Sequence, residues 1–146
     1  MYQEKLRLIE KEDGYINEGC SLKELDIFSK KVKEKLKNNL PNEYIDFLSI
    51  TNGIEYNGLI IYGVDKSIVD KAGKQNVTGY IESNLIWYEN EHQKEYMFFG
   101  DGNISWYCYD INKNLYVELD KPSGELVQEF SSFDDMIENA LEISLI

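Results

Sequence analysis

The chain has 146 residues, with 15 Lys and Arg against 27 Asp and Glu, and a formal net charge of −12. This length predicts a single domain over residues 1–146, and the 42% hydrophobic and 13% aromatic content excludes a disordered chain. No apolar run approaches the roughly 18 residues of a membrane span, and no basic and then apolar leader follows Met1, so we expect a cytoplasmic protein.

The first third of the chain is predicted to be helical. Residues 1–20 are weakly patterned, with at most one helical turn. Ser21-Leu22-Lys23-Glu24 is a capping box, and apolar residues then recur at helical spacing to about Lys37. Pro41 is predicted to be the first residue of a second helix, which ends at Asn52-Gly53.

A β-hairpin is expected next, because Asn57-Gly58 separates two short apolar runs at 54–56 and 59–62. Residues 63–76 form a polar connection. A third helix is predicted from about residue 77 to 91, even though Gly79 is unfavourable inside a helix. Its predicted inner face is Ile81, Leu85 and Tyr88.

From residue 96 the hydrophobic period changes from helical to strand-like. Turn sequences at 100–103, 110–114 and 122–124 separate the runs, and Ser132 is placed to cap a closing helix. Strands joined by short turns pair antiparallel. We therefore predict an α+β domain with an antiparallel or mixed sheet of about five to six strands, with helices covering one side. The predicted strands are residues 96–99, 104–109, 115–119 and 125–130.

The charge is concentrated in the second half. Residues 1–80 contain 12 basic and 13 acidic side chains, whereas residues 81–146 contain 3 basic and 14 acidic ones. An acidic field repels phosphate backbones and anionic lipids, which argues against nucleic acid and membrane partners. It favours a partner with a basic surface and speeds the encounter with it. The alternative is that the charge only keeps the chain soluble.

The sequence contains no clear catalytic or metal-binding motif. Cys20 and Cys108 fit no metal spacing and are expected to be free thiols. His92 is the only histidine and reads as a surface residue. Asp110-x-Asn112-x-Asn114 copies the start of a calcium loop, but the glycine and glutamate that such a loop needs later are missing, so a tight turn is favoured. We predict a protein that is not an enzyme, with no cofactor and no metal.

The order of several short motifs resembles the SUKH superfamily, which includes the yeast cell-wall-synthesis regulators and many bacterial immunity proteins. The resemblance covers roughly residues 20–143. It implies an α+β fold and, in bacteria, a role in binding and blocking a secreted toxin. The matching stretches are 40–48 (LPNEYIDFL), 51–53 (TNG), 59–63 (LIIYG), 99–102 (FGDG) and 131–137 (SSFDDMI).

We combine this resemblance with the charge pattern into a site hypothesis. Secreted toxins are often nucleases with basic surfaces, which an acidic inhibitor would occlude. Accessible carboxylates would set the rate of encounter, and an aromatic anchor would supply affinity; Tyr107 is expected to be exposed for this purpose. Two alternatives remain: a regulatory scaffold with an endogenous protein partner, and a small hydrolase that uses two convergent carboxylates. The predicted partner-binding residues are Glu89, Glu91, Glu95, Asp101, Tyr107 and Asp110.

Overall fold

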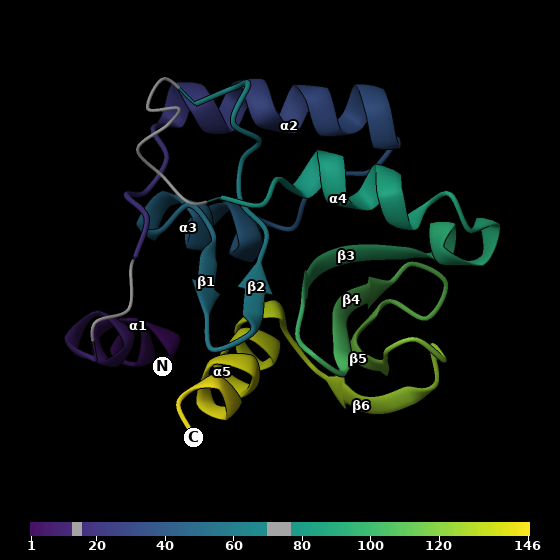
Figure 1. Ribbon diagram of the computed structural model, residues 1–146. Helices are drawn as coiled ribbons and strands as arrows, with labels where there is room; N and C mark the ends of the chain where they lie inside the picture. The colour runs from purple at the N-terminus through teal and green to yellow at the C-terminus, as the bar shows by residue number, and fades with distance from the viewer. Residues whose placement is uncertain (13–15, 70–76) are drawn as a thin grey trace.

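The computed structural model describes residues 1–12, 16–69 and 77–146. Within these ranges the chain forms five α-helices, one short 3₁₀ helix and six strands (Figure 1). The helices are α1 (Tyr2–Lys11), α2 (Leu22–Leu36), α3 (Asn42–Ile50), α4 (Tyr80–Trp87), η1 (Glu91–Glu95, 3₁₀) and α5 (Phe133–Ser144). The strands are β1 (Ile54–Tyr56), β2 (Leu59–Ile61), β3 (Tyr96–Asp101), β4 (Ser105–Asp110), β5 (Leu115–Asp120) and β6 (Leu126–Phe130).

The strands lie in the sheet in chain order, and each is antiparallel to the next. Figure 1 shows α2 and α4 stacked above β3, and β3 to β6 curling into a half-open trough. The predicted α+β fold with an antiparallel sheet is confirmed. No helix in the described ranges has the length and apolar character needed to cross a membrane.

The local signals read from the sequence are confirmed at several element ends. Asn57 and Gly58 both have positive φ, 48° and 85°, as a two-residue hairpin turn with the sheet's twist requires. Ser21 and Glu24 form the complete capping box of α2, and Ser132 accepts a hydrogen bond from the Asp135 amide at the start of α5. Pro41 differs from its prediction, because it precedes α3 as the N-cap residue. Part of the predicted polar connection, residues 70–76, lies outside the described ranges.

Helical residues cover both faces of β3, and not only one side of the sheet as predicted. Phe98 and Phe99 are adjacent, so their side chains point to opposite faces, and both are fully buried. The Phe99 ring lies 4.8 Å from Tyr44 of α3. The Phe98 ring lies 6.0 Å from Trp87 at the end of α4 and 5.9 Å from Trp106 of β4. Strand β3 is therefore held between two aromatic clusters.

The inner face of α4 is partly polar. The spacing of apolar residues therefore predicted the wrong inner face for this helix. Leu85, predicted to face inward, is 46% exposed. Asn84 takes the inward position and pairs with the backbone of β3, donating to the Phe98 carbonyl at 2.9 Å and accepting from the Phe98 amide at 2.9 Å. A buried polar side chain with such partners costs little. Hydrogen bonding, and not an apolar stripe, fixes the rotation of this helix.

The first turn of α4 is capped by a carboxylate from elsewhere in the chain. Asp65 accepts hydrogen bonds from the amides of Ile81 and Glu82 at 3.1 and 3.0 Å. Gly79 precedes the helix, and a Cβ at this position would lie 2.1 Å from Asp65 Oδ2. The glycine that seemed unfavourable within a helix therefore lies outside it and leaves room for the cap.

This geometry predicts coupled effects of Asp65→Ala and Gly79→Ala. Each should destabilise the fold by about 1–3 kcal/mol, because each removes the same carboxylate from one buried and one partly buried amide. The double variant should lose clearly less than the sum of the two single losses. Urea unfolding followed by circular dichroism measures all four free energies. Additive losses would show that Gly79 does not act through the cap.

Candidate partner-binding surface

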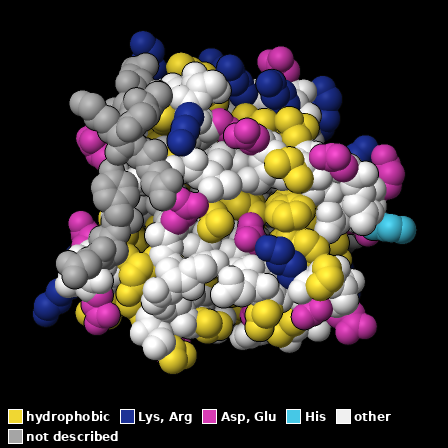
Figure 2. All heavy atoms as spheres, in the orientation of Figure 1, with side chains coloured by type: hydrophobic (Ala, Val, Ile, Leu, Met, Phe, Trp, Pro, Cys, Tyr) yellow, Lys and Arg dark blue, Asp and Glu magenta, His cyan; other side chains and the backbone are white. Residues whose placement is uncertain are grey.

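Three of the predicted site residues lie together on the segment that joins α4 to β3. Glu89, Glu91 and Glu95 are all exposed there. Asn90 starts the 3₁₀ turn by accepting a hydrogen bond from the His92 amide at 3.1 Å. In Figure 2, acidic side chains gather beside the single histidine side chain at the right edge of the molecule. We call residues 89–95 the acidic segment.

Aromatic packing holds the acidic segment in place. Tyr88, directly before it, lies 6.4 Å from the Phe98 ring and donates its hydroxyl to the Tyr96 carbonyl. Trp87 lies 5.5 Å from Trp106. A segment fixed in this way loses little conformational freedom when it binds a partner, so less of the interaction energy is spent on ordering it.

Some cations lie near this charge, because Lys35, Lys37 and Lys94 line a surface hollow together with Glu89. Lys94 lies 3.0 Å from Glu91, but both side chains are more than half exposed, and such pairs contribute little. Glu95 accepts a hydrogen bond from Asn112 at 3.4 Å. Neither Glu89 nor Glu95 forms an ion pair with a described residue. The three carboxylates of the acidic segment therefore stay exposed and accessible to a partner.

A cavity of about 270 Å³ opens between the acidic segment, strands β3 to β5 and the β5–β6 turn. Phe98, Trp106 and Leu119 supply its apolar wall, and His92 and Glu95 lie at its rim. The remaining lining residues are Asn90, Gln93, Tyr96, Pro122, Ser123 and Gly124. Exposed carboxylates next to an apolar hollow suit a partner that presents both a cation and an apolar group.

Two of the predicted site residues are not on the surface. Tyr107, expected to be exposed, is 4% exposed, because β4 turns this side chain toward α5. Asp110 is 8% exposed and accepts hydrogen bonds from the amides of Asn112 and Lys113 at 3.0 and 3.1 Å. Asp110 therefore shapes the β4–β5 turn. The tight turn predicted at residues 110–114 is confirmed.

Asp101 is largely occupied by partners of its own. Its carboxylate lies 3.2 Å from the Lys121 ammonium and accepts a hydrogen bond from the Tyr62 hydroxyl. The Tyr62 hydroxyl also accepts a hydrogen bond from the Trp87 indole at 3.0 Å. Lys121 lies 5.7 Å from the centre of the Trp87 ring. Asp101 thus ties β3 to α4 and contributes little free negative charge.

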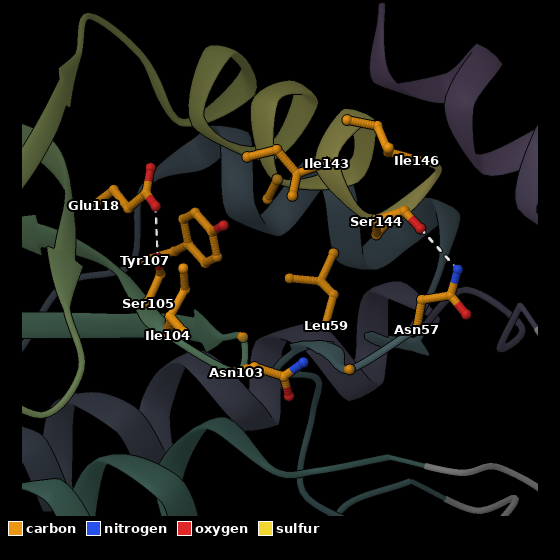
Figure 3. A pocket seen from close by; sticks show the side chains of 13 residues that line it. Asn57, Leu59, Asn103, Ile104, Ser105, Tyr107, Glu118, Ile143, Ser144 and Ile146 are labelled. Atoms are coloured by element: carbon orange, nitrogen blue, oxygen red, sulfur yellow. Dashed lines mark hydrogen bonds between the residues drawn. The ribbon is translucent and has the colours of Figure 1, made fainter.

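A second cavity, of about 440 Å³, lies between α5, the β1–β2 turn and the β3–β4 turn. Figure 3 shows Ser105 and Glu118 beside Tyr107 at one end, with Asn57 and Ser144 at the other. Glu118 accepts a hydrogen bond from the Ser105 hydroxyl at 2.6 Å. Burial, and next the charge of Glu118, raise the pKa of Tyr107 to about 12, so this hydroxyl keeps its proton at neutral pH.

Glu118 was missed in the sequence. It alternates with Val117 and Leu119, and such alternation predicts a solvent-facing carboxylate on a half-buried strand. The end of α5 covers this face, however, and leaves Glu118 only 7% exposed.

Two carboxylates do converge, as the hydrolase alternative requires, but away from both cavities. Glu43 and Asp134 lie in the first turns of α3 and α5. Burial, and next the charge and hydrogen bond of Glu43, raise the pKa of Asp134 from 3.8 to about 6. Neither residue lines the two cavities described above. We therefore expect the proximity of these two carboxylates to affect the stability of the fold.

The remaining candidate ligands show no metal centre. Cys20 and Cys108 are both buried, and neither forms a disulfide, as expected. Within the residues that the structure describes, no group of three or more His, Cys, Asp and Glu side chains is arranged to hold a metal ion.

The raised pKa of Asp134 predicts a pH-dependent stability. The folded state favours the protonated form of Asp134 more than the unfolded state does. The free energy of unfolding of the wild-type chain should therefore fall as the pH rises from about 4 through 6, where the carboxyl loses its proton. The free energy of unfolding of Asp134→Asn should therefore rise relative to wild type over this range and stay level above it. Glu43→Gln should reduce the same dependence, because it removes the neighbouring charge. Denaturation curves at pH 4 to 8 measure this, and a difference independent of pH would contradict it.

Comparison with known proteins agrees with the fold. The SMI1 / KNR4 family (SUKH-1) matches residues 19–139, which is most of the chain and includes α2 to α4, the whole sheet and the first part of α5. No curated protein matches the chain closely enough to count as a relative. The family match agrees with the resemblance seen in the ordered motifs, and the chain belongs to the SMI1 / KNR4 family (SUKH-1).

Proposed function

We propose that this chain is an immunity protein that binds and neutralises a cognate protein toxin through the acidic segment. The observation that carries the proposal is the set of three exposed carboxylates, Glu89, Glu91 and Glu95, on a segment anchored by aromatic packing. Membership of a family with a binding role supports it. The role is binding and not catalysis, and it takes place in the cytoplasm.

The charge distribution supports a basic partner surface. Residues 81–146 carry 14 of the 27 acidic side chains but only 3 of the 15 basic ones. Long-range attraction raises the rate at which a basic surface meets such a face, and salt screens it. A toxin with a basic substrate-binding surface, such as a nuclease, would be blocked by a protein that covers this surface.

The adjacent cavity suggests how affinity would be gained after encounter. Interfaces draw most of their energy from a few well-packed anchors, while peripheral charges mainly set the association rate. Trp106 and Phe98 form a preformed apolar wall next to the carboxylates. The partner's anchor would enter this cavity while its cations face Glu89, Glu91 and Glu95.

Charge reversal of the acidic segment tests the proposal. The cognate toxin is first sought among the genes adjacent to the one for this chain; its toxic domain is then expressed with and without the chain, and growth reports neutralisation. The triple variant Glu89→Lys, Glu91→Lys, Glu95→Lys should associate with the toxin at least about tenfold more slowly at low salt, because the attractive field becomes repulsive. Surface plasmon resonance at several salt concentrations measures the association rate.

A control with the same change in net charge separates a local effect from a general one. Three exposed carboxylates on α1, after it and on α2 supply this control: Glu10→Lys, Glu12→Lys, Glu34→Lys. The control should associate much faster than the acidic-segment variant. Equal rates for both would refute the proposed face. Failure to restore growth, together with an endogenous protein partner, would favour the scaffold alternative.

A further inference from the structure

The 440 Å³ cavity beside α5 contains a buried carboxylate without a cationic partner in the described part of the chain. Glu118 is 7% exposed, and it accepts a hydrogen bond from the Ser105 hydroxyl. No described Lys or Arg lies within ion-pair distance of it. Buried carboxylates in proteins are normally paired, because removing a charge from water is costly. The Glu118 carboxylate is therefore suited to pair with a cation that a ligand or partner protein supplies.

The cavity walls are apolar and reach the surface. Leu59 and Ala140 are buried in the wall, whereas Ile104 and Ile143 are 73% and 52% exposed at the rim (Figure 3). Isolated exposed apolar residues are ordinary, but here they flank the entrance of a hollow that ends at a carboxylate. The lining therefore matches a ligand with an aliphatic stem and a charged head.

Lysine and arginine side chains have this form, since they bury their methylene groups and keep the cationic end on a polar partner. We propose that this cavity receives a lysine or arginine side chain of a partner protein, with its cation on Glu118 and its stem between Leu59, Ile104 and Ile143. The net charge of −12 favours a basic partner over an acidic one. Tyr107, held protonated beside Glu118, is placed to pack against the stem.

The inferred anchor rests on the proposed function only in taking a protein as the partner. The cavity is lined by residues other than those of the acidic segment. A toxin could bind the acidic segment without using the cavity, and the cavity could bind a basic side chain of another protein. Small-molecule probes test the cavity separately from the acidic segment, because they lack the large protein surface through which a toxin would bind that segment.

The test is a nuclear magnetic resonance titration of the ¹⁵N-labelled full chain with Nα-acetyl-arginine methylamide and Nα-acetyl-lysine methylamide. Single side chains are small ligands, so dissociation constants in the millimolar range are expected. The amide signals of Ser105, Tyr107, Glu118 and Ile143 should move, while those of the acidic segment should not. The neutral isostere Nα-acetyl-citrulline methylamide should bind at least about tenfold more weakly than the arginine probe, because it lacks the charge.

Two variants localise the effect. Glu118→Gln removes the charge but keeps the shape and an acceptor for Ser105, and it should weaken the arginine probe about tenfold. Glu129→Gln removes an exposed carboxylate on the neighbouring strand β6 and should leave binding unchanged. Unchanged spectra far from the cavity confirm that each variant is folded. Equal binding of the arginine and citrulline probes to the wild-type chain, or no movement of the cavity signals, would overturn the proposal without touching the toxin-binding role.

Discussion

The arrangement of this molecule depends on the need to cover both faces of β3. Phe98 and Phe99 are consecutive and fully buried, so apolar groups must approach the strand from two sides. Tyr44 and Phe133 pack on Phe99, and the end of α4 reaches over the strand to pack on Phe98. The acidic segment leaves α4 at this point, so its location follows from the burial of Phe98.

Local chemistry made much of the fold predictable. Asn57-Gly58 adopts the positive φ angles that its hairpin turn needs, and Ser21 with Glu24 closes a capping box within four residues. Signals of this kind depend on neighbours in the chain and are visible in a sequence. Strands joined by short turns pair with each other for the same reason, which gave the antiparallel sheet.

What could not be predicted depends on segments far apart in the chain. The rotation of α4 is set by Asn84 on the backbone of β3, and its first turn is completed by Asp65. Neither contact can be predicted from the spacing of apolar residues along the chain. The site shows the same limit: Glu91 and Glu95 were identifiable as accessible acids, whereas the burial of Tyr107 and Glu118 requires knowledge of where α5 ends.

Because the strands lie in the sheet in chain order, the domain also has an expected order of assembly. Strands β3 to β6 are joined by short turns, so their pairing closes only small loops, whereas β2 meets β3 across the whole of residues 62–95. Small loops close fastest and non-local pairing is slow. The curled four-stranded unit would therefore form first, with the β1–β2 hairpin docking later. The aromatic wall of Phe98 and Trp106 belongs to the unit that forms early, and it depends on the slower, non-local part of folding only for the cover that α4 provides.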